Sequence, residues 1–171
     1  MRQISVEKIT LNIGAGKDQV KLEKGMKLIK NIAGLTPVKT FTKKRIQEWG
    51  LRPGLPIGCK LTLRSKEALD LLKRLFEAKD NLLQASNFDN EGNISFGISE
   101  YIDVPGIKYD PDIGIMGFQV CITLKRNGFR IRHRALKRHV IPRKHRIKKE
   151  EAINFMKDAF NLNTGEQNDL Q

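Results

Sequence analysis

A glycine-rich turn is the first feature of the sequence whose residue types could do chemistry. Gly14-Ala15-Gly16-Lys17 stands between an alternating apolar stretch and a segment with helical spacing. Such a turn can offer backbone N–H groups and a helix dipole to a phosphate. A nucleotide-binding loop needs Ser or Thr after the lysine, where this chain has Asp18, and a dinucleotide-binding turn needs a glycine in place of Gln19. We therefore predict a tight turn that also touches a phosphate, without a bound nucleotide.

The histidines and carboxylates do not predict a catalytic or metal site. All three histidines lie in one strongly basic stretch, at His133, His139 and His145. Metal ligation there would gather cations around a cation with no Asp, Glu or Cys nearby, so phosphate or base contacts suit these residues better. Asp110 and Asp112 flank Pro111 in an expected loop, where solvated carboxylates are common. We predict that the chain is not an enzyme and holds no metal or cofactor.

The net charge of +13 is concentrated in one segment. Residues 125–149 contain twelve Lys or Arg and no acid, and the remaining twenty basic and nineteen acidic residues nearly cancel. An unrelieved basic block repels itself unless a polyanion neutralises it, and nucleic acid is the polyanion that we expect. A membrane surface fits less well, because the segment has few apolar residues and no clean amphipathic stripe.

Two further regions differ in charge. Residues 39–64 carry seven basic residues and only Glu48 as an acid, with Lys and Arg beside Thr as in many RNA-contacting sheets. Phe41 and Trp49 could stack there on bases or lie in the core. Residues 89–112 are acidic apart from Lys108, which indicates either plain solvent exposure or a basic protein partner.

The hydrophobic periodicity predicts an α+β fold. Strands are expected at residues 6–13, 38–42, 57–64, 94–98 and 118–124. Helices are expected at residues 17–33 and 149–160, and a third helix is expected to begin after a Ser65 cap. We expect an exposed, flexible loop at residues 50–58 and irregular structure at residues 99–114. The tail at residues 161–171 is expected to be polar and frayed. We expect a single domain over residues 1–171, with a mostly antiparallel sheet, helices packed on one face, and a basic extended segment at about 125–149.

The apolar residues of each predicted helix are expected to form its buried face. These residues are Leu22, Met26, Ile29 and Ala33; Ala68, Leu69, Leu72, Leu75 and Phe76; and Ala152, Ile153, Met156, Ala159 and Phe160. Cys59 and Cys121 are too few for a disulfide scaffold and are expected to be ordinary strand residues. No secretion signal and no membrane-spanning run is expected, so we predict a cytoplasmic protein.

Five ordered motifs resemble a known family, the universal large-subunit ribosomal protein number five, which binds 5S ribosomal RNA. They are Leu11-Asn12-Ile13-Gly14-Ala15-Gly16, Gly34-Leu35-Thr36-Pro37-Val38, Ile57-Gly58-Cys59-Lys60-Leu61-Thr62-Leu63-Arg64, Gly92-Asn93-Ile94-Ser95-Phe96-Gly97-Ile98 and Pro105-Gly106-Ile107-Lys108-Tyr109-Asp110. The likeness covers roughly residues 4–160. The basic segment and the ending from His145 to Ala152 are similar to the archaeal and eukaryotic branch.

The resemblance implies a structural constituent of the large ribosomal subunit, with four sites. The 5S RNA would contact Asn12, Thr36, Lys39, Thr40, Lys43, Lys44, Lys60, Thr62 and Arg64. The loop nearest the P-site transfer RNA would be Arg52, Pro53, Gly54, Leu55 and Pro56. Large-subunit ribosomal RNA would contact Arg130, Arg132, Arg134, Lys137, Arg138, Arg143, Lys144 and Arg146. A small-subunit head protein, across an intersubunit bridge, would meet Asp103, Lys108, Tyr109, Asp110 and Asp112. Other large-subunit proteins are further expected partners.

Two positions depart from the family pattern, and two other functions stay open. Leu35 replaces a common Gln, so any RNA hydrogen bond from that side chain is lost. Lys148 replaces the Thr that usually caps the last helix, and this replacement should weaken the cap by about 1 kcal/mol. A free RNA chaperone or ribosome assembly factor would bind unrelated RNAs equally well. An RNA-directed enzyme would turn over an RNA substrate. The basic segment is expected to order only on RNA.

Overall fold

The computed structural model describes residues 1–64 and 66–165, and its centre is a five-stranded sheet. The strands are β1 (Ile4–Gly14), β2 (Val38–Phe41), β3 (Pro56–Leu63), β5 (Ile94–Ile98) and β6 (Phe118–Arg126). They lie in the order β2-β3-β1-β6-β5, and every neighbouring pair is antiparallel. The predicted α+β class and the mostly antiparallel sheet are confirmed.

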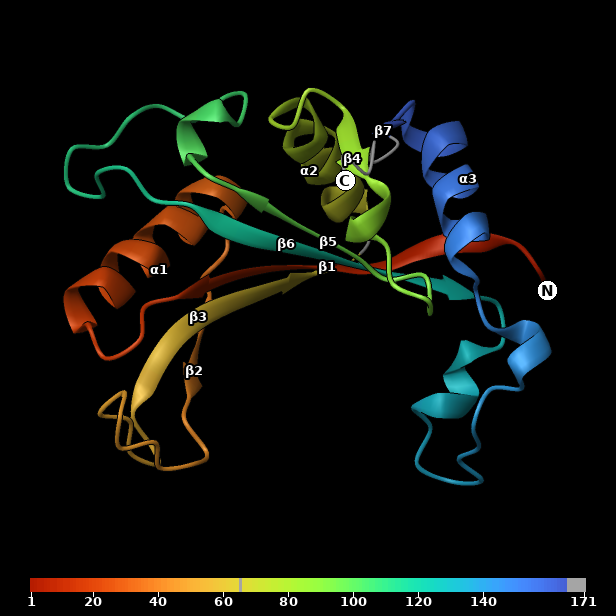
Figure 1. Cartoon of the computed structure of the whole chain (residues 1–171), viewed down its shortest axis with the longest axis horizontal. Helices are drawn as coiled ribbons and strands as arrows, with labels where there is room; N and C mark the ends of the chain where they lie inside the picture. Colours follow the sequence, from red (N-terminus) through yellow and green to blue (C-terminus); the bar gives the residue numbers. More distant parts are fainter. Residues whose placement is uncertain (65, 166–171) are drawn as a thin grey trace, which may run out of the picture.

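In the part of the chain that the structure describes, three helices cover one face of this sheet and leave the other uncovered (Figure 1). They are α1 (Gln19–Ala33), α2 (Lys66–Glu77) and α3 (Lys149–Phe160). Period-two alternation in the strands explains the difference between the faces. On β1 the buried residues Ile9, Leu11 and Ile13 point towards the helices, while Thr10 and Asn12 between them are partly exposed.

Helix α1 is fixed at both ends and lies close to the sheet. The carboxylate of Asp18 accepts hydrogen bonds from the N–H groups of Val20 and Lys21, at 2.9 and 3.2 Å. Gly34 ends the helix in the left-handed conformation, at φ 70°, as predicted. A Cβ at Gly25 would lie 3.1 Å from Cγ2 of Ile13. The small residue therefore permits the close helix–sheet contact.

The predicted buried faces of the helices are confirmed only in part. In α1, Met26 and Ala33 are partly buried and pack against the core, and Gly25, Leu28 and Ile32 are buried as well. In α2, Leu69 is exposed and Leu71 is buried, because the stripe facing the sheet follows the i, i+3, i+4 spacing from Ala68. In α3, Ala159 is exposed and Ile153 only partly buried; Phe160, also partly buried, packs edge-on against Phe76, with ring centroids 5.4 Å apart.

The predicted loops also need correction. In the expected flexible loop 50–58, Leu51 is buried in a bridge to Ile46, and β3 already begins at Pro56. Residues 161–165 are not frayed: Leu162 is buried, and β7 (Asn163–Gly165) pairs in parallel with β4 (Leu82–Gln84), two short strands that the sequence did not predict. The predicted Ser65 cap and the end of the tail at 166–171 lie outside the described residues. Residues 99–114 are irregular, as predicted, apart from one 3-10 turn at Tyr101–Asp103.

Both cysteines are free thiols. Cys59 is buried under α1, and this burial raises the pKa of its thiol to about 11. Within the described part of the chain, no helix is long and apolar enough to cross a membrane.

Candidate nucleic-acid interface

The uncovered face of the sheet is polar and carries cations at one side. Antiparallel register places Lys60, Asn12 and Gln119 side by side across β3, β1 and β6, and Thr62, Thr10 and Cys121 in the next row. The side-chain amide of Asn12 donates to Oε1 of Gln119 at 3.3 Å, which joins two of these strands. We call this surface the open face: Thr10, Asn12, Thr40, Lys60, Thr62, Arg64, Gln119, Cys121, Thr123 and Ser95.

The open face gathers five of the nine predicted 5S RNA contacts: Asn12, Thr40, Lys60, Thr62 and Arg64. The guanidinium of Arg64 lies 3.4 Å from the carboxylate of Glu7 but is still 58% exposed, so it can also reach a phosphate. Lys39 pairs with Cys59, whose side chain is under α1, so Lys39 projects from the other side of the sheet edge. Thr36, Lys43 and Lys44 are exposed and flank β2 without lying on the open face.

The loop between β2 and β3 is held at its base and exposed at its tip. Both the N–H and the hydroxyl of Thr42 donate to the carbonyl of Leu55, and the N–H of Gly54 donates to the carbonyl of Thr42 at 2.9 Å. Arg52 and Pro53 are exposed, while Leu55 and Pro56 are partly buried. Nearby, Phe41 and Trp49 are 57% and 65% exposed, so neither aromatic ring belongs to the core.

The glycine turn does not have its backbone free for a phosphate. The N–H groups of Ala15 and Gly16 both donate to the carbonyl of Ile57, at 2.9 and 3.0 Å. The carboxylate of Asp18 already occupies the N-terminus of α1, and it would repel an anion there. The predicted tight turn is confirmed, and its predicted phosphate contact through these groups is wrong, because the turn's donors bind β3.

The basic segment, residues 125–149, has an exposed middle and anchored ends. Residues 130–140 are all exposed and include Arg130, Arg132, Arg134, Lys137 and Arg138; Arg143 and Lys144 are exposed further along. Between the end of β6 at Arg126 and the start of α3 at Lys149, its regular structure is two 3-10 turns, at Phe129–Arg132 and Arg143–His145. Two of the predicted contacts already use their guanidinium groups: Arg134 donates to the carbonyl of Lys137, and Arg146 donates to the carbonyl of Ile141 and pairs with Glu91 at 3.4 Å.

One buried arginine ties the two ends of this segment together. Arg126, 4% exposed at the end of β6, pairs with Glu151 of α3 at 2.7 Å and donates to the carbonyls of His145 and Arg146. Glu151 also accepts the N–H of Lys148 at 2.9 Å, which caps α3. This hydrogen bond, and next the hydrogen bond and the charge of Arg126, lower the pKa of Glu151. The segment is therefore a closed loop on a fixed base.

The histidines have different environments. The ring of His145 lies 3.0 Å from the carbonyl of Asn127 through Nε2 and packs edge-on against Phe129 at 5.7 Å. His133 and His139 instead line a pocket beside the sheet. Across residues 1–64 and 66–165, no three His, Cys, Asp or Glu side chains converge as metal ligands would.

The acidic loop, residues 102–114, is held to the body of the protein. The hydroxyl of buried Tyr101 accepts the N–H of Asp110 at 2.9 Å. Asp112 pairs with Lys27 of α1 at 2.8 Å, and this contact lowers the pKa of Asp112 and raises the pKa of Lys27. Asp103, Lys108 and Tyr109 are exposed. The loop therefore offers a partner fewer free carboxylates than its composition indicates.

Together these elements form an arch. Figure 1 shows the β2–β3 loop and the basic segment descending from opposite ends of the sheet, on the side away from the helices. The open face lies between them. Such an arch can hold a long, rigid polyanion against a polar floor, with cations on both sides.

Sequence reasoning missed part of the floor. Gln119, Cys121 and Thr123 of β6 and Thr10 of β1 lie beside the predicted contacts. The signal was present, because these residues alternate with the apolar residues of strands that the sequence did predict. Only the register, which depends on long-range pairing, brings them next to Asn12 and Thr62.

Comparisons with known proteins identify the family to which the chain belongs. The family model described as Ribosomal protein L5 matches residues 1–52, and the model for the C-terminus of the same ribosomal family matches residues 56–155. The large ribosomal subunit protein uL5 of Sulfolobus acidocaldarius is 48% identical over 95% of this chain and 91% of the relative. Those of Sulfurisphaera tokodaii and Nanoarchaeum equitans are each 46% identical over 95% of this chain, and over 92% and 96% of the relative.

These matches define the chain as a ribosomal protein, and it belongs to the L5 family. It is a structural constituent of the large ribosomal subunit, found on ribosomes in the cytoplasm, and not an enzyme. The predicted family is confirmed. Both family-model segments contribute strands to the same sheet and residues to one hydrophobic core.

Proposed function

We propose that the chain binds 5S ribosomal RNA through its open face. The observation that carries the proposal is the uncovered, polar sheet surface with Lys60 and Arg64 at one side, between two basic regions. A sheet with hydrogen-bonding and cationic side chains at fixed spacing can match a folded RNA backbone. The choice of 5S RNA among ribosomal RNAs rests on the family resemblance of the sequence motifs.

A binding comparison tests this proposal. The purified chain is titrated with 5S RNA and with a size-matched scrambled RNA at several salt concentrations. We expect a preference of about a hundredfold or more that survives physiological salt, because specific contacts add to charge neutralisation. Equal binding to both RNAs, collapsing steeply with salt, would contradict the proposal and favour the RNA chaperone or assembly factor.

The β2–β3 loop is proposed to contact the P-site transfer RNA. Its exposed tip, Arg52 and Pro53, stands at the end of the arch, on a base fixed by Thr42. Cleavage of the transfer RNA by hydroxyl radicals from a probe tethered at residue 53 of assembled ribosomes would support the contact. Cleavage confined to 5S RNA would contradict it.

The acidic loop is proposed to face a basic small-subunit head protein across an intersubunit bridge, with other large-subunit proteins nearby. Tyr109, 55% exposed, and Asp103 are the side chains free to make that contact. A cross-linker at residue 109 should capture a small-subunit protein only in joined ribosomes. Capture in isolated large subunits alone would contradict the bridge.

A further inference from the structure

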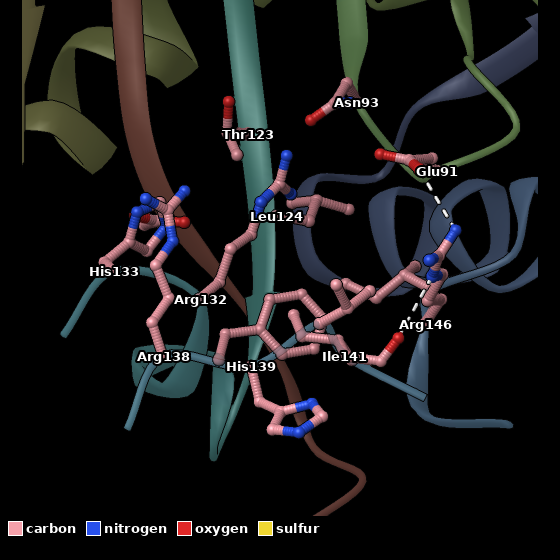
Figure 2. Close-up of a pocket in the computed structure, with 14 residues that line it drawn as sticks. Glu91, Asn93, Thr123, Leu124, Arg132, His133, Arg138, His139, Ile141 and Arg146 are labelled. Atoms are coloured by element: carbon pink, nitrogen blue, oxygen red, sulfur yellow. Dashed lines mark hydrogen bonds and ion pairs between the residues drawn. The ribbon is translucent and has the colours of Figure 1, made fainter. Parts of the chain in front are cut away.

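A pocket of about 640 Å³ lies between the basic segment and the end of the sheet. Its size falls within the range of pockets that hold small ligands. Figure 2 shows the side chains of Thr123 and Asn93 on the sheet side, His133 and Arg138 on one flank, and Glu91 paired with Arg146 on the other. With Glu7 of β1, the pocket therefore has walls from four separate parts of the chain.

The lining combines the chemistry that a nucleotide needs. Phe129, Leu124 and Ile141 supply apolar surface for a base. Among the described residues, the guanidinium groups of Arg132 and Arg138 make no hydrogen bond or ion pair, so both are available for a phosphate. Arg146, in contrast, is used within the wall, where it joins Ile141 and Glu91.

Groups that can read the edge of a base are present as well. β5 begins at Ile94, which pairs with Ile122, so the outer edge of β6 at Thr123 and Leu124 has no paired strand among the described residues. Thr123 and Leu124 line the pocket at that edge. The side-chain amide of Asn93 donates to Asp89 at 3.3 Å, which leaves its oxygen as an acceptor.

We propose that this pocket takes one unpaired nucleotide of ribosomal RNA, with its base between Phe129 and the β6 edge and its phosphate on Arg132 and Arg138. Single-stranded bases are recognised in this way, by apolar or aromatic contact and hydrogen bonds to their edges. An RNA strand is favoured over a free nucleotide because Arg130, Arg134 and Lys137 continue the basic surface and could bind adjoining phosphates. The proposal rests on the proposed RNA-binding function.

The first test uses mononucleotides on the full-length chain. Each of the four ribonucleoside 5′-monophosphates, and inorganic phosphate as a separate probe, is titrated to millimolar concentration and followed by amide NMR. We expect the amides of Asn93, Thr123 and Leu124 to shift with at least one nucleotide and not with inorganic phosphate. Equal shifts with phosphate alone, or no shift at these amides, would overturn the proposal.

Two variants make the test specific. Thr123→Trp should fill the pocket and abolish these shifts. Ser95→Trp places the same side chain on the neighbouring strand of the open face, outside the pocket lining, and should keep them. The amide spectra also report whether each variant is folded. Nucleotide shifts that persist in folded Thr123→Trp would overturn the assignment of the pocket.

A second arm identifies the source of the nucleotide. Ultraviolet cross-linking of large subunits that contain the chain should yield a ribosomal nucleotide attached to Phe129. Mononucleotide binding without that adduct would show a site for a free nucleotide and overturn the RNA assignment. If 5S RNA binding fails while the adduct forms, the proposed function falls and the pocket stands, so the two failures are distinguishable.

Discussion

The two basic regions of the molecule present their charges in opposite ways. On the open face, Lys60 and Thr62 project from β3, whose register with β1 fixes their spacing, and Arg64 follows directly after this strand. In the basic segment, eleven consecutive exposed residues at 130–140 contain no α-helix or strand, and their regular structure is limited to the end of one 3-10 turn. One region holds few charges on a sheet, and the other holds many charges on an exposed loop.

This difference separates specific recognition of a folded RNA from general electrostatic attraction of polyanions. Charges at defined spacing can discriminate between folded RNAs, whereas a dense basic loop attracts any polyanion and loses affinity as salt rises. The pair between Arg126 and Glu151 connects the two regions, because it anchors the loop to the end of β6. We expect the geometry of the open face to depend on the packing of the core. We expect the position of the basic segment to depend on the Arg126–Glu151 pair.

The largest expected effect is a loss of folding stability when the central sheet is disturbed. A Cβ at Gly58 would lie 2.5 Å from the carbonyl oxygen of Ile13, so Gly58→Ala should destabilise the protein by about 3 kcal/mol, since the backbone must move. Gly97→Ala is the matched control on β5, where a Cβ meets nothing within 4 Å. Chemical denaturation of both variants checks the prediction. Equal midpoints would contradict it.

The next effect breaks the base of the basic segment. Glu151→Gln leaves buried Arg126 without its counter-charge and should cost about 2 kcal/mol, less than a fully buried pair because the Glu151 side chain is 43% exposed. Glu150→Gln, one residue away and exposed, is the control. Denaturation midpoints measure both, and a larger loss in the Glu150 variant would contradict the account.

The contribution of Glu151 should also depend on pH. Its folded pKa is lowered below the ordinary value of 4.5, so the stabilisation is present above that value and is lost as the pH falls through the folded pKa. The stability difference between the wild type and Glu151→Gln should therefore narrow below pH 4.5. If the stability difference between the wild type and Glu151→Gln widened as the pH falls, the assigned role of Glu151 would be contradicted.

A smaller effect of opposite sign concerns the cap of α3. Lys148 has no side-chain acceptor at the N-cap, although Glu151 accepts its backbone N–H. Lys148→Thr should stabilise the protein by about 1 kcal/mol, because the hydroxyl can accept a free N–H of the first turn. Thermal unfolding at neutral pH checks this. A lower midpoint in the variant would rule out the capping argument.

The smallest effect sharpens the comparison between the ordered sheet and the exposed loop. Deleting residues 133–140 should leave the far-ultraviolet circular dichroism of the free protein nearly unchanged, because no helix or strand lies there. A large loss of signal would show that the segment has regular structure without RNA. That the segment becomes ordered only on RNA remains a prediction.

The sequence predicted the elements that carry their own periodic signal. Alternation identified β1, β3, β5 and β6, and the spacing of apolar residues identified the three helices, with α3 at its observed bounds of Lys149–Phe160. The wrong positions, such as Leu69 for Leu71, arise where the orientation of a helix on the sheet decides between neighbouring apolar residues. Strands β4 and β7 were missed, because three-residue strands have no periodicity of their own.

The candidate interface was predicted in composition but not in arrangement. Lys60, Thr62 and Arg64 could be placed on one strand face from alternation alone. That Lys39 projects from the other side, that Ala15 and Gly16 donate to Ile57, and that Arg126 is buried depend on contacts between distant segments. The pocket beside β6 depends on where the basic segment lies relative to that strand, which no local pattern indicates.

The most direct measurement compares two variants that remove equal charge from the two regions. Lys60→Ala with Arg64→Ala should lower the affinity ratio of 5S RNA to scrambled RNA by about tenfold, roughly 1.4 kcal/mol. Arg130→Ala with Arg134→Ala should weaken both RNAs together and reduce both salt slopes, leaving the ratio nearly unchanged. An equal fall of the ratio in both variants, or a fall only in the second, would contradict recognition by the open face.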